Sequence, residues 1–220
     1  MGDRALGLSP RLPYLVVEGP IGAGKTTLAR RLAADTGARL LLEKPEDNPF
    51  LPRFYRDPVG GALPAQLGFL LQRAGQVETF QQGDLFDRHW VADFLFDKDR
   101  LFAELTLSPA DLTLYEALFQ RLAWDVPAPD AVIYLTGPVE TLLARIARRG
   151  RDYEASIDAR YLEDLSARYA RFFGRYQAAP VIEVDVSQVD LVAQPELYQE
   201  LLAALARPRG YSRLRQAELL

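Results

Sequence analysis

A glycine-rich stretch that ends in lysine and threonine is the strongest chemical signal in the sequence. Residues 19–26 read GPIGAGKT and fit the pattern G-x-x-x-x-G-K-T. Glycines let such a loop wrap closely around a polyphosphate, so that backbone N–H groups and the positive end of a following helix face the anion. We expect Lys25 to reach the β- and γ-phosphates and the Thr26 hydroxyl to bind Mg²⁺. The residues predicted to bind the phosphate donor are Gly19, Gly22, Ala23, Gly24, Lys25, Thr26 and Thr27.

Two carboxylates are expected at the same edge of the fold as this loop. Glu43 ends the apolar run 39–43, and Asp87 lies near the end of the segment 84–88, which reads as another buried strand. In an open parallel sheet the ligand crevice lies at the carboxyl ends of the strands. Glu43 is therefore expected to face the site, although exposure at the start of a loop is the commoner arrangement for glutamate. A carboxylate at the position of Asp87 can bind the metal or its water shell.

A cluster of arginines near residue 150 is the third chemical signal. Arg145, Arg149 and Arg151 surround Gly150 at the end of a helical pattern. Helix dipoles favour cations at such an end, so a solvated basic face is one interpretation. The clustering in an acidic protein, and the break that glycine provides, favour mobile cations over a transferred phosphoryl group. We therefore predict an arginine-rich lid at residues 145–156.

Strand and helix patterns alternate along the chain and would position these residues. Apolar runs predict five strands, at residues 14–17, 39–43, 84–88, 131–135 and 181–186. Helical patterns cover residues 27–36, 64–82, 91–105, 109–125, 138–151, 157–177 and 195–206. Unbroken apolar strands fit a parallel sheet that is covered on both faces. We predict one α/β domain over residues 1–220, a P-loop kinase three-layer sandwich with a five-stranded parallel sheet flanked by helices.

Two polar side chains should project from one side of the helix at 64–82. Gln66 and Arg73 are seven residues apart, which corresponds to two helical turns. Spacing alone leaves open whether they face a ligand or the solvent. His89, the single histidine of the sequence, is interpreted as structural rather than catalytic.

The composition excludes several classes of protein. The chain has 220 residues, a formal net charge of −4 and no cysteine, which excludes disulfides, cysteine metal sites and thiol nucleophiles. The negative charge argues against nucleic acid or an anionic membrane as the main partner. The sequence shows no signal-peptide core and no apolar run of about 20 residues, so a cytoplasmic location is expected.

Taken together, these residues resemble the deoxynucleoside kinase family, which includes deoxycytidine, deoxyadenosine and deoxyguanosine kinases. The resemblance covers nearly the whole chain. It implies that Glu43 is the general base for the 5′-hydroxyl of the nucleoside. It implies that Tyr55 and Gln66, eleven residues apart, bind the sugar 3′-hydroxyl and the base edge. It also implies that Arg73, seven residues beyond the glutamine, reads the base together with Asp93.

The resemblance also implies roles for residues around the phosphates. Asp87 is implied as a magnesium ligand, and Arg88 as a residue near the 5′-oxygen. The lid pattern R-x-x-x-R-G-R followed by an acid implies that Arg145 flanks the donor adenine and that Glu154 binds the 3′-hydroxyl. The residues implied to neutralise charge on the transferred group are Lys25, Arg88, Arg149 and Arg151.

The expected reaction is transfer of a phosphoryl group from MgATP to the 5′-hydroxyl of a deoxynucleoside, for nucleotide salvage. The charged pair at the base suits deoxyadenosine, deoxyguanosine or deoxycytidine better than thymidine, and the two purines most. Two other functions remain open on sequence grounds: a nucleoside monophosphate kinase such as thymidylate kinase, and a non-catalytic ATP-binding module. The family resemblance further implies a homodimer through a helix bundle, with the helices at 91–105 and 109–124 as the expected interface.

Overall fold

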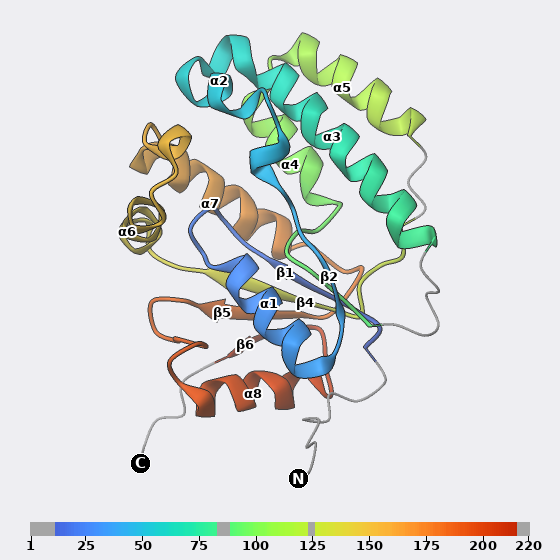
Figure 1. The fold of residues 1–220 in the computed structure, drawn as a ribbon, viewed down its shortest axis with the longest axis vertical. Helices are drawn as coiled ribbons and strands as arrows, with labels where there is room; N and C mark the ends of the chain where they lie inside the picture. Colours follow the sequence, from blue (N-terminus) through green and yellow to red (C-terminus); the bar gives the residue numbers. More distant parts are fainter. Residues whose placement is uncertain (1–11, 83–88, 123–125, 215–220) are drawn as a thin grey trace.

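Six parallel strands form the sheet at the centre of the molecule (Figure 1). The computed structural model describes residues 12–82, 89–122 and 126–214. Within them the strands are β1 (Tyr14–Glu18), β2 (Arg39–Leu41), β3 (Trp90–Ala92), β4 (Ala131–Thr136), β5 (Val181–Asp185) and β6 (Tyr211–Leu214). Their order in space is β2-β3-β1-β4-β5-β6, and each neighbouring pair is parallel.

The predicted parallel α/β sheet is confirmed, but the predicted number of five strands is wrong. The additional strand, β6, reads YSRL and pairs with β5 at the edge of the sheet. Its first three residues are exposed. An exposed edge strand lacks the continuous apolar run that marks a strand buried on both faces, so the sequence pattern did not reveal it.

Helices cover both faces of the sheet. They are α1 (Lys25–Thr36), α2 (Leu51–Arg56), α3 (Pro58–Gln82), α4 (Lys98–Thr106), α5 (Pro109–Arg121), α6 (Val139–Arg149), α7 (Ala159–Phe173) and α8 (Pro195–Leu205). Two short 3₁₀ helices, η1 (Pro45–Asp47) and η2 (Asp152–Glu154), lie in the connections. None of the helices in the described part of the chain is long and apolar enough to cross a membrane.

The helices divide into layers around the sheet. Helices α1 and α8 lie on one face, where the Arg31 guanidinium is 3.6 Å from the centre of the Tyr198 ring. Helix α7 lies on the other face, and its Phe173 ring is 4.3 Å from the ring of Tyr134 in β4. Helices α2 to α5 pack against one another and form the group drawn at the top of Figure 1. This group lies on the same side of the sheet as α7, which α4 contacts, and its helices α3 and α4 contribute residues to the cavity described below.

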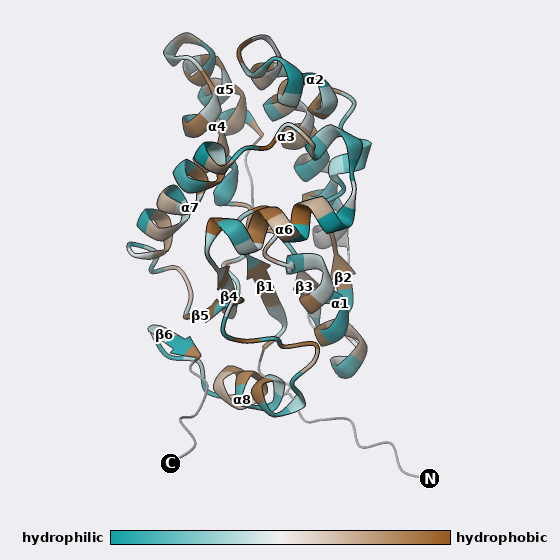
Figure 2. Ribbon diagram, turned by 90° about the vertical axis from the view of Figure 1, so that its left-hand side faces the viewer, coloured by the Kyte–Doolittle hydropathy of each residue, from teal (hydrophilic) through white to brown (hydrophobic). Residues whose placement is uncertain are grey.

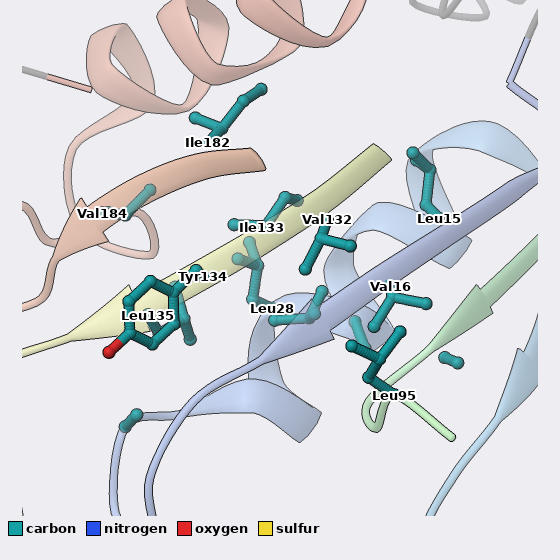
Figure 3. Close-up of a cluster of buried hydrophobic side chains, with 14 of the residues drawn as sticks. Leu15, Val16, Leu28, Leu95, Val132, Ile133, Tyr134, Leu135, Ile182 and Val184 are labelled. Atoms are coloured by element: carbon teal, nitrogen blue, oxygen red, sulfur yellow. The ribbon is translucent and has the colours of Figure 1, made fainter. Parts of the chain in front are cut away.

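The core consists of apolar side chains on both faces of the central strands. Figure 3 shows part of it, where Val16 of β1, Val132 of β4 and Leu28 of α1 lie close together. All three are less than 5% exposed. In Figure 2 the central strands are hydrophobic, while the surrounding helices carry both polar and apolar residues. Burial of this kind contributes about 25 cal/mol for each Å² of apolar surface, and it gives the site a rigid floor.

The described strand β3 lies where the sequence analysis expected a helix to begin. The strand predicted at 84–88 lies outside the described residues and stays a prediction, but the helix predicted to begin at Val91 does not begin there. Instead Trp90–Ala92 forms β3, which pairs with β1 on one side and β2 on the other. The following helix, α4, begins only at Lys98. As a result Asp93 is not a helical residue, and it directly follows the carboxyl end of a buried strand.

Candidate active site

A cavity of about 800 Å³ opens at the carboxyl ends of the strands. This is the edge at which parallel α/β sheets bind ligands. The predicted site residues that line the cavity are Gly22, Ala23, Gly24, Lys25, Thr26, Thr27, Glu43, Tyr55, Gln66, Arg73, Asp93, Arg145, Arg149, Arg151 and Glu154. Gly19 forms the turn that leads into the loop and is not part of the lining. Asp87 and Arg88 lie outside the described residues, so their roles stay predictions.

The phosphate loop joins β1 to α1, as the sequence predicts. Three of its glycines have positive φ angles, namely 153° at Gly19, 85° at Gly22 and 96° at Gly24. A Cβ atom at Gly22 would stand 2.6 Å from the carbonyl oxygen of Leu142, so the loop tolerates no side chain there. Helix α1 begins at Lys25 without a capping side chain and without an acidic residue in its first turn. Its first N–H groups are therefore free to bind an anion.

The Lys25 ammonium lies under the loop that it follows. Its Nζ donates hydrogen bonds to the carbonyl oxygens of Gly19, at 2.7 Å, and Pro20, at 3.1 Å. Burial lowers its pKa, and the nearby charge of Lys98 adds to that effect, while surrounding carboxylates oppose it. A cation in this position, next to a helix N-terminus, favours a bound polyphosphate.

Asp93 contacts the phosphate loop rather than Arg73. Its Oδ2 accepts a hydrogen bond from the Thr26 hydroxyl at 2.5 Å, and its Oδ1 accepts one from the backbone N–H of Glu43 at 2.7 Å. Burial raises the pKa of Asp93, and both hydrogen bonds act in the opposite direction. The predicted pairing of Asp93 with Arg73 is wrong, because Arg73 pairs with Asp99 instead. The reason is the strand at 90–92, which carries Asp93 to the loop edge of the cavity.

Glu43 lies between two cations on the floor of the cavity. Its Oε1 accepts a hydrogen bond from Arg73 Nη2 at 2.5 Å, and its Oε2 accepts one from Lys98 Nζ at 3.3 Å. Burial alone would raise the pKa of Glu43, but Lys98, Arg73 and Lys25 together lower it to about 2. Glu43 is therefore a carboxylate at neutral pH, and its side chain is only 19% exposed.

Arg73, Asp99 and Tyr115 form a buried polar chain on the far wall of the cavity. The Arg73 guanidinium is ion-paired with Asp99, and the Tyr115 hydroxyl donates a hydrogen bond to Asp99 Oδ2 at 2.6 Å. Gln66 lies on the same helix as Arg73 and donates through its amide to the Thr106 hydroxyl at 3.2 Å. Gln66 and Arg73 are both buried, 5% and 4% exposed, so the solvent-facing alternative for this pair is wrong.

Tyr55 and Glu154 both line the cavity. The rings of Tyr55 and Tyr153 stack with 6.1 Å between their centres. Burial is the main cause that raises the pKa of Tyr55, which keeps its hydroxyl protonated. Glu154, 4% exposed, accepts two hydrogen bonds from the Arg149 guanidinium, at 2.6 and 3.0 Å. The two residues thus present a hydroxyl and a carboxylate to the cavity.

The arginines of the predicted lid occupy different places. Helix α6 ends at Arg149, and Gly150 follows with a φ of 67°. Arg145 donates to the carbonyl oxygens of Ala23, at 3.2 Å, and Val186, at 3.0 Å, so it bridges the phosphate loop and the segment after β5. Arg151 lies 3.4 Å from a carboxylate oxygen of Glu46. Arg149 and Arg151 both line the cavity.

Sequence reasoning missed three charged residues of the site. Lys98 and Asp99 open α4, and Glu18 is the last residue of β1; all three are at most 2% exposed. Lysine is rare in this chain, with only Lys25, Lys44 and Lys98, and that scarcity was the available signal for Lys98. The predicted structural role of His89 agrees with its position, since its Nδ1 lies 3.3 Å from the carbonyl oxygen of Leu12.

Comparison with known proteins identifies the family. The family model for deoxynucleoside kinase matches residues 15–207. The deoxyguanosine kinase of Bacillus subtilis (strain 168) is 36% identical over 196 residues, which covers 87% of this chain and 95% of that protein. The deoxyadenosine/deoxycytidine kinase of the same strain is 30% identical over 207 residues, covering 90% and 93%.

A solved structure shares the fold. The structure of deoxyadenosine kinase from M. mycoides with bound dCTP matches with a TM-score of 0.72 at 23% identity, over 86% of this chain and 98% of that chain. The family match over nearly the whole chain sets aside the two other functions that the sequence left open. The chain belongs to the deoxynucleoside kinase family, whose members transfer a phosphoryl group from a nucleotide donor to a nucleoside.

Proposed function

We propose that this deoxynucleoside kinase acts on deoxyadenosine, deoxyguanosine or deoxycytidine, with the purine deoxynucleosides preferred, and that Glu43 is the general base for the 5′-hydroxyl. One observation carries the proposal. The Glu43 carboxylate lies between the phosphate loop and the Arg73–Asp99 pair, so a nucleoside held by that pair would present its sugar to Glu43. ATP is the donor, and its γ-phosphoryl group is transferred in line.

The low pKa of Glu43 is compatible with this role. An ionised carboxylate is the form that accepts a hydrogen bond from a hydroxyl group. Phosphoryl transfer passes through a loose transition state, in which the attacking oxygen is only weakly bonded to phosphorus. Proton transfer is then late, and orientation of the hydroxyl matters more than basicity.

The donor half follows from the loop and its neighbours. Phosphates would bind the N-terminus of α1 and Lys25, and Arg145 would flank the donor adenine from its position over Ala23. Arg149 and Arg151, within the proposed lid at residues 145–156, would neutralise charge on the transferred group.

The Thr26 hydroxyl and the Asp93 carboxylate fit a magnesium ion. They are in mutual contact at the start of α1, and both supply the hard oxygen ligands that Mg²⁺ prefers. When bound, the ion would neutralise charge on the β- and γ-phosphates. The sequence-based assignment of Asp87 as a ligand remains a prediction.

The acceptor half would bind the sugar and the base separately. Tyr55 and Glu154 would bind the 3′-hydroxyl. Gln66, Arg73 and Asp99 would meet the base edge with amide, guanidinium and carboxylate groups, which together offer both donors and acceptors. Such a set suits adenine, guanine or cytosine, each of which carries an exocyclic amino group that can donate to a carboxylate, whereas thymine carries none. Asp99 takes the place that the sequence analysis had given to Asp93.

We further propose that the protein is a homodimer through helices α3 and α5. The sequence analysis expected the helix at 91–105 beside α5, but residues 91 and 92 belong to β3 and the large apolar side chains of α4 are not exposed, so α3 takes its place in the proposal. Four leucines on or next to these two helices are exposed, to between 36% and 68%: Leu71, Leu114, Leu118 and Leu122. Exposed apolar side chains that gather on adjacent helices are typical of an interface. Sedimentation of Leu118→Glu should give a monomer, whereas the wild type sedimenting as a monomer would refute the dimer.

A nucleoside panel with labelled ATP tests the proposal. The four deoxynucleosides, the corresponding ribonucleosides and the deoxynucleoside monophosphates are compared by kcat/KM. We expect a purine deoxynucleoside or deoxycytidine to be the best acceptor, by a factor of about 10² or more over thymidine, because buried polar groups would be left unpaired by the wrong base. Thymidine as the best acceptor would overturn the assignment of Arg73 and Asp99.

A further inference from the structure

A buried lysine lies beneath the boundary between the donor and acceptor halves. Lys98 is 2% exposed, and its Nζ lies 3.3 Å from Glu43 Oε2 and 3.6 Å from Glu18 Oε2. A buried ammonium is costly unless it is paired, so two carboxylates at this distance explain why it can be held there. They do not explain why the chain places a lysine in this position at all.

Glu18 does not require Lys98 to satisfy its hydrogen bonds. Its Oε1 accepts from the Gly19 backbone N–H at 2.8 Å and from the Tyr169 hydroxyl at 2.9 Å. Its Oε2 accepts from the Leu95 backbone N–H at 2.7 Å. Three donors already hold both oxygens of this carboxylate. Glu18 is thus a rigid anion, fixed to the first residue of the phosphate loop.

Glu43 depends on Lys98 to a greater degree. Among the described residues, Arg73 supplies the hydrogen bond to Oε1 and Lys98 the one to Oε2. A carboxylate that is held at both oxygens, from two different helices, cannot rotate freely about its last side-chain bond. Lys98 is also nearer to Glu43 than to Glu18, which a lysine that served only to neutralise Glu18 would not need to be.

We propose that Lys98 is a positioning residue for phosphoryl transfer: anchored by Glu18 under the phosphate loop, it holds the Glu43 carboxylate in the orientation that meets the acceptor hydroxyl. This inference rests on the proposed role of Glu43. It connects the two halves, because the same buried Glu18 contacts Gly19 of the loop and the ammonium that orients Glu43. Lys98 acts through Glu43 and is not assigned a contact with substrate.

Two substitutions separate position from charge. Lys98→Gln removes the charge, and Lys98→Arg keeps it but places it on a longer, planar group. We expect kcat to fall about 100-fold in Lys98→Gln and about 10-fold in Lys98→Arg, while the KM values for nucleoside and ATP change less than about threefold. Arg100→Gln, which removes an exposed positive charge from the same helix two residues further on and outside the cavity lining, is the matched control and should keep wild-type kinetics.

The absence of cysteine allows a sharper version of the test. Lys98→Cys would carry the only thiol in the chain, and 2-bromoethylamine converts it to a close analogue of lysine. Alkylation under denaturing conditions followed by refolding reaches the buried position. Treatment with 2-bromoethylamine should restore kcat to within about threefold of the wild type, whereas 2-bromoethanol, which adds a neutral group of similar size, should not.

Several outcomes would overturn the inference. These are a kcat of Lys98→Gln within threefold of the wild type, a kcat of Lys98→Arg equal to the wild type, or equal recovery with the two alkylating reagents. If the neutral variants do not fold, the aminoethylated protein and Lys98→Arg still decide, because both keep the charge but only the aminoethylated side chain keeps the ammonium group at nearly the position that it has in lysine. Glu43→Gln separates the two proposals. If Glu43→Gln keeps its turnover, Glu43 is not the general base. If Glu43→Gln loses its turnover while the Lys98 variants stay active, only the proposed role of Lys98 is refuted.

Discussion

The donor half of the cavity is built mainly from backbone atoms of one contiguous stretch, whereas the acceptor half is built from charged side chains that distant segments bring together. The loop at 19–26 supplies N–H groups at the start of α1. The acceptor wall takes Glu43 from beyond β2, Arg73 from α3, and Lys98 and Asp99 from α4. A site made of backbone is fixed by local conformation, while a site made of side chains depends on tertiary pairing.

The two halves also differ in how they are held. Positive φ angles and close backbone contacts fix the loop, so substitution of its glycines should distort it. Mutual ion pairs fix the acceptor wall, and removing one partner leaves another charge buried and poorly compensated. Changes in the acceptor half are therefore expected to affect catalysis and base selection, and changes in the donor half to affect ATP binding and local folding.

Glu43→Gln should have the largest effect. It removes the proposed base and leaves its two cationic partners with a neutral amide, so kcat should fall by about 10²–10⁴-fold, while KM for ATP stays within about threefold. Steady-state kinetics with saturating deoxynucleoside measure this. Glu43→Asp keeps the charge but shortens the side chain, so its kcat should lie between those of Glu43→Gln and the wild type. A wild-type kcat in Glu43→Gln would show that Glu43 is not the base.

The two aspartates provide a direct comparison of the halves. Asp99→Asn weakens the partner of Arg73 and should raise KM for the nucleoside by about 10- to 100-fold with little change in KM for ATP. Asp93→Asn should instead raise the Mg²⁺ concentration needed for half-maximal rate, because Asp93 contacts Thr26.

Kinetics at varied nucleoside, ATP and Mg²⁺ concentrations separate these effects. If Asp93→Asn raised KM for the nucleoside and Asp99→Asn did not, Asp93 would be the base-binding aspartate, as the sequence analysis expected. The assignment of Asp93 to the donor half and of Asp99 to the acceptor half would then be wrong.

Local sequence patterns predicted the phosphate loop of the donor half well, because each part of the loop is close in sequence to the next. The strand, the loop and the helix at 14–36 follow one another, and glycine and lysine spacing is sufficient to predict them. Glu43 was also placed correctly near a strand end. The arginine-rich segment at 145–151 lies at the cavity, as its composition indicated.

Local sequence patterns could not predict which charged side chains pair with one another in the acceptor half. The sequence analysis gave Arg73 the partner Asp93, whereas the structure pairs it with Asp99, because residues 90–92 form a strand that carries Asp93 toward Thr26. Lys98 and Asp99 look like ordinary surface charges at a helix start, since their burial arises only when α3 and α5 pack on α4. Glu18 was hidden within an apolar strand, where a buried carboxylate has no local signal.

Gly22→Ala should have a smaller effect, restricted to the donor half. Its Cβ would stand 2.6 Å from the Leu142 carbonyl oxygen, so the loop must shift and kcat/KM for ATP should fall about tenfold or more. Gly37→Ala is the matched control, because Gly37 has a φ of 70° but a Cβ at this position would meet no atom within 4 Å. It should lose about 1 kcal/mol of stability and keep wild-type kinetics. Equal kinetic losses in both would show that backbone strain, rather than the loop contact, is responsible.

Acid unfolding should show the smallest effect, and it tests whether ion pairs hold the acceptor half. The pKa of Glu43 is about 2 in the folded protein against an ordinary value of 4.5, so the unfolded state takes up its proton first as the pH falls. The stabilisation is complete above about pH 4.5 and is lost as the pH falls toward 2. Urea unfolding should therefore show that Glu43→Gln is less stable than the wild type at pH 7, by an amount on the order of 1–3 kcal/mol, and that the difference narrows by about pH 3.

An exposed carboxylate provides the control for this measurement. Glu46→Gln removes a surface carboxylate paired with Arg151 and should change little at either pH, because surface pairs contribute little to stability. A difference between Glu43→Gln and the wild type that is the same at neutral and at acid pH would mean that packing, and not the charge of Glu43, holds this wall together. Packing would then hold the acceptor half in place, as it holds the core beneath it. The two halves would differ in their catalytic roles but not in whether charge stabilises them.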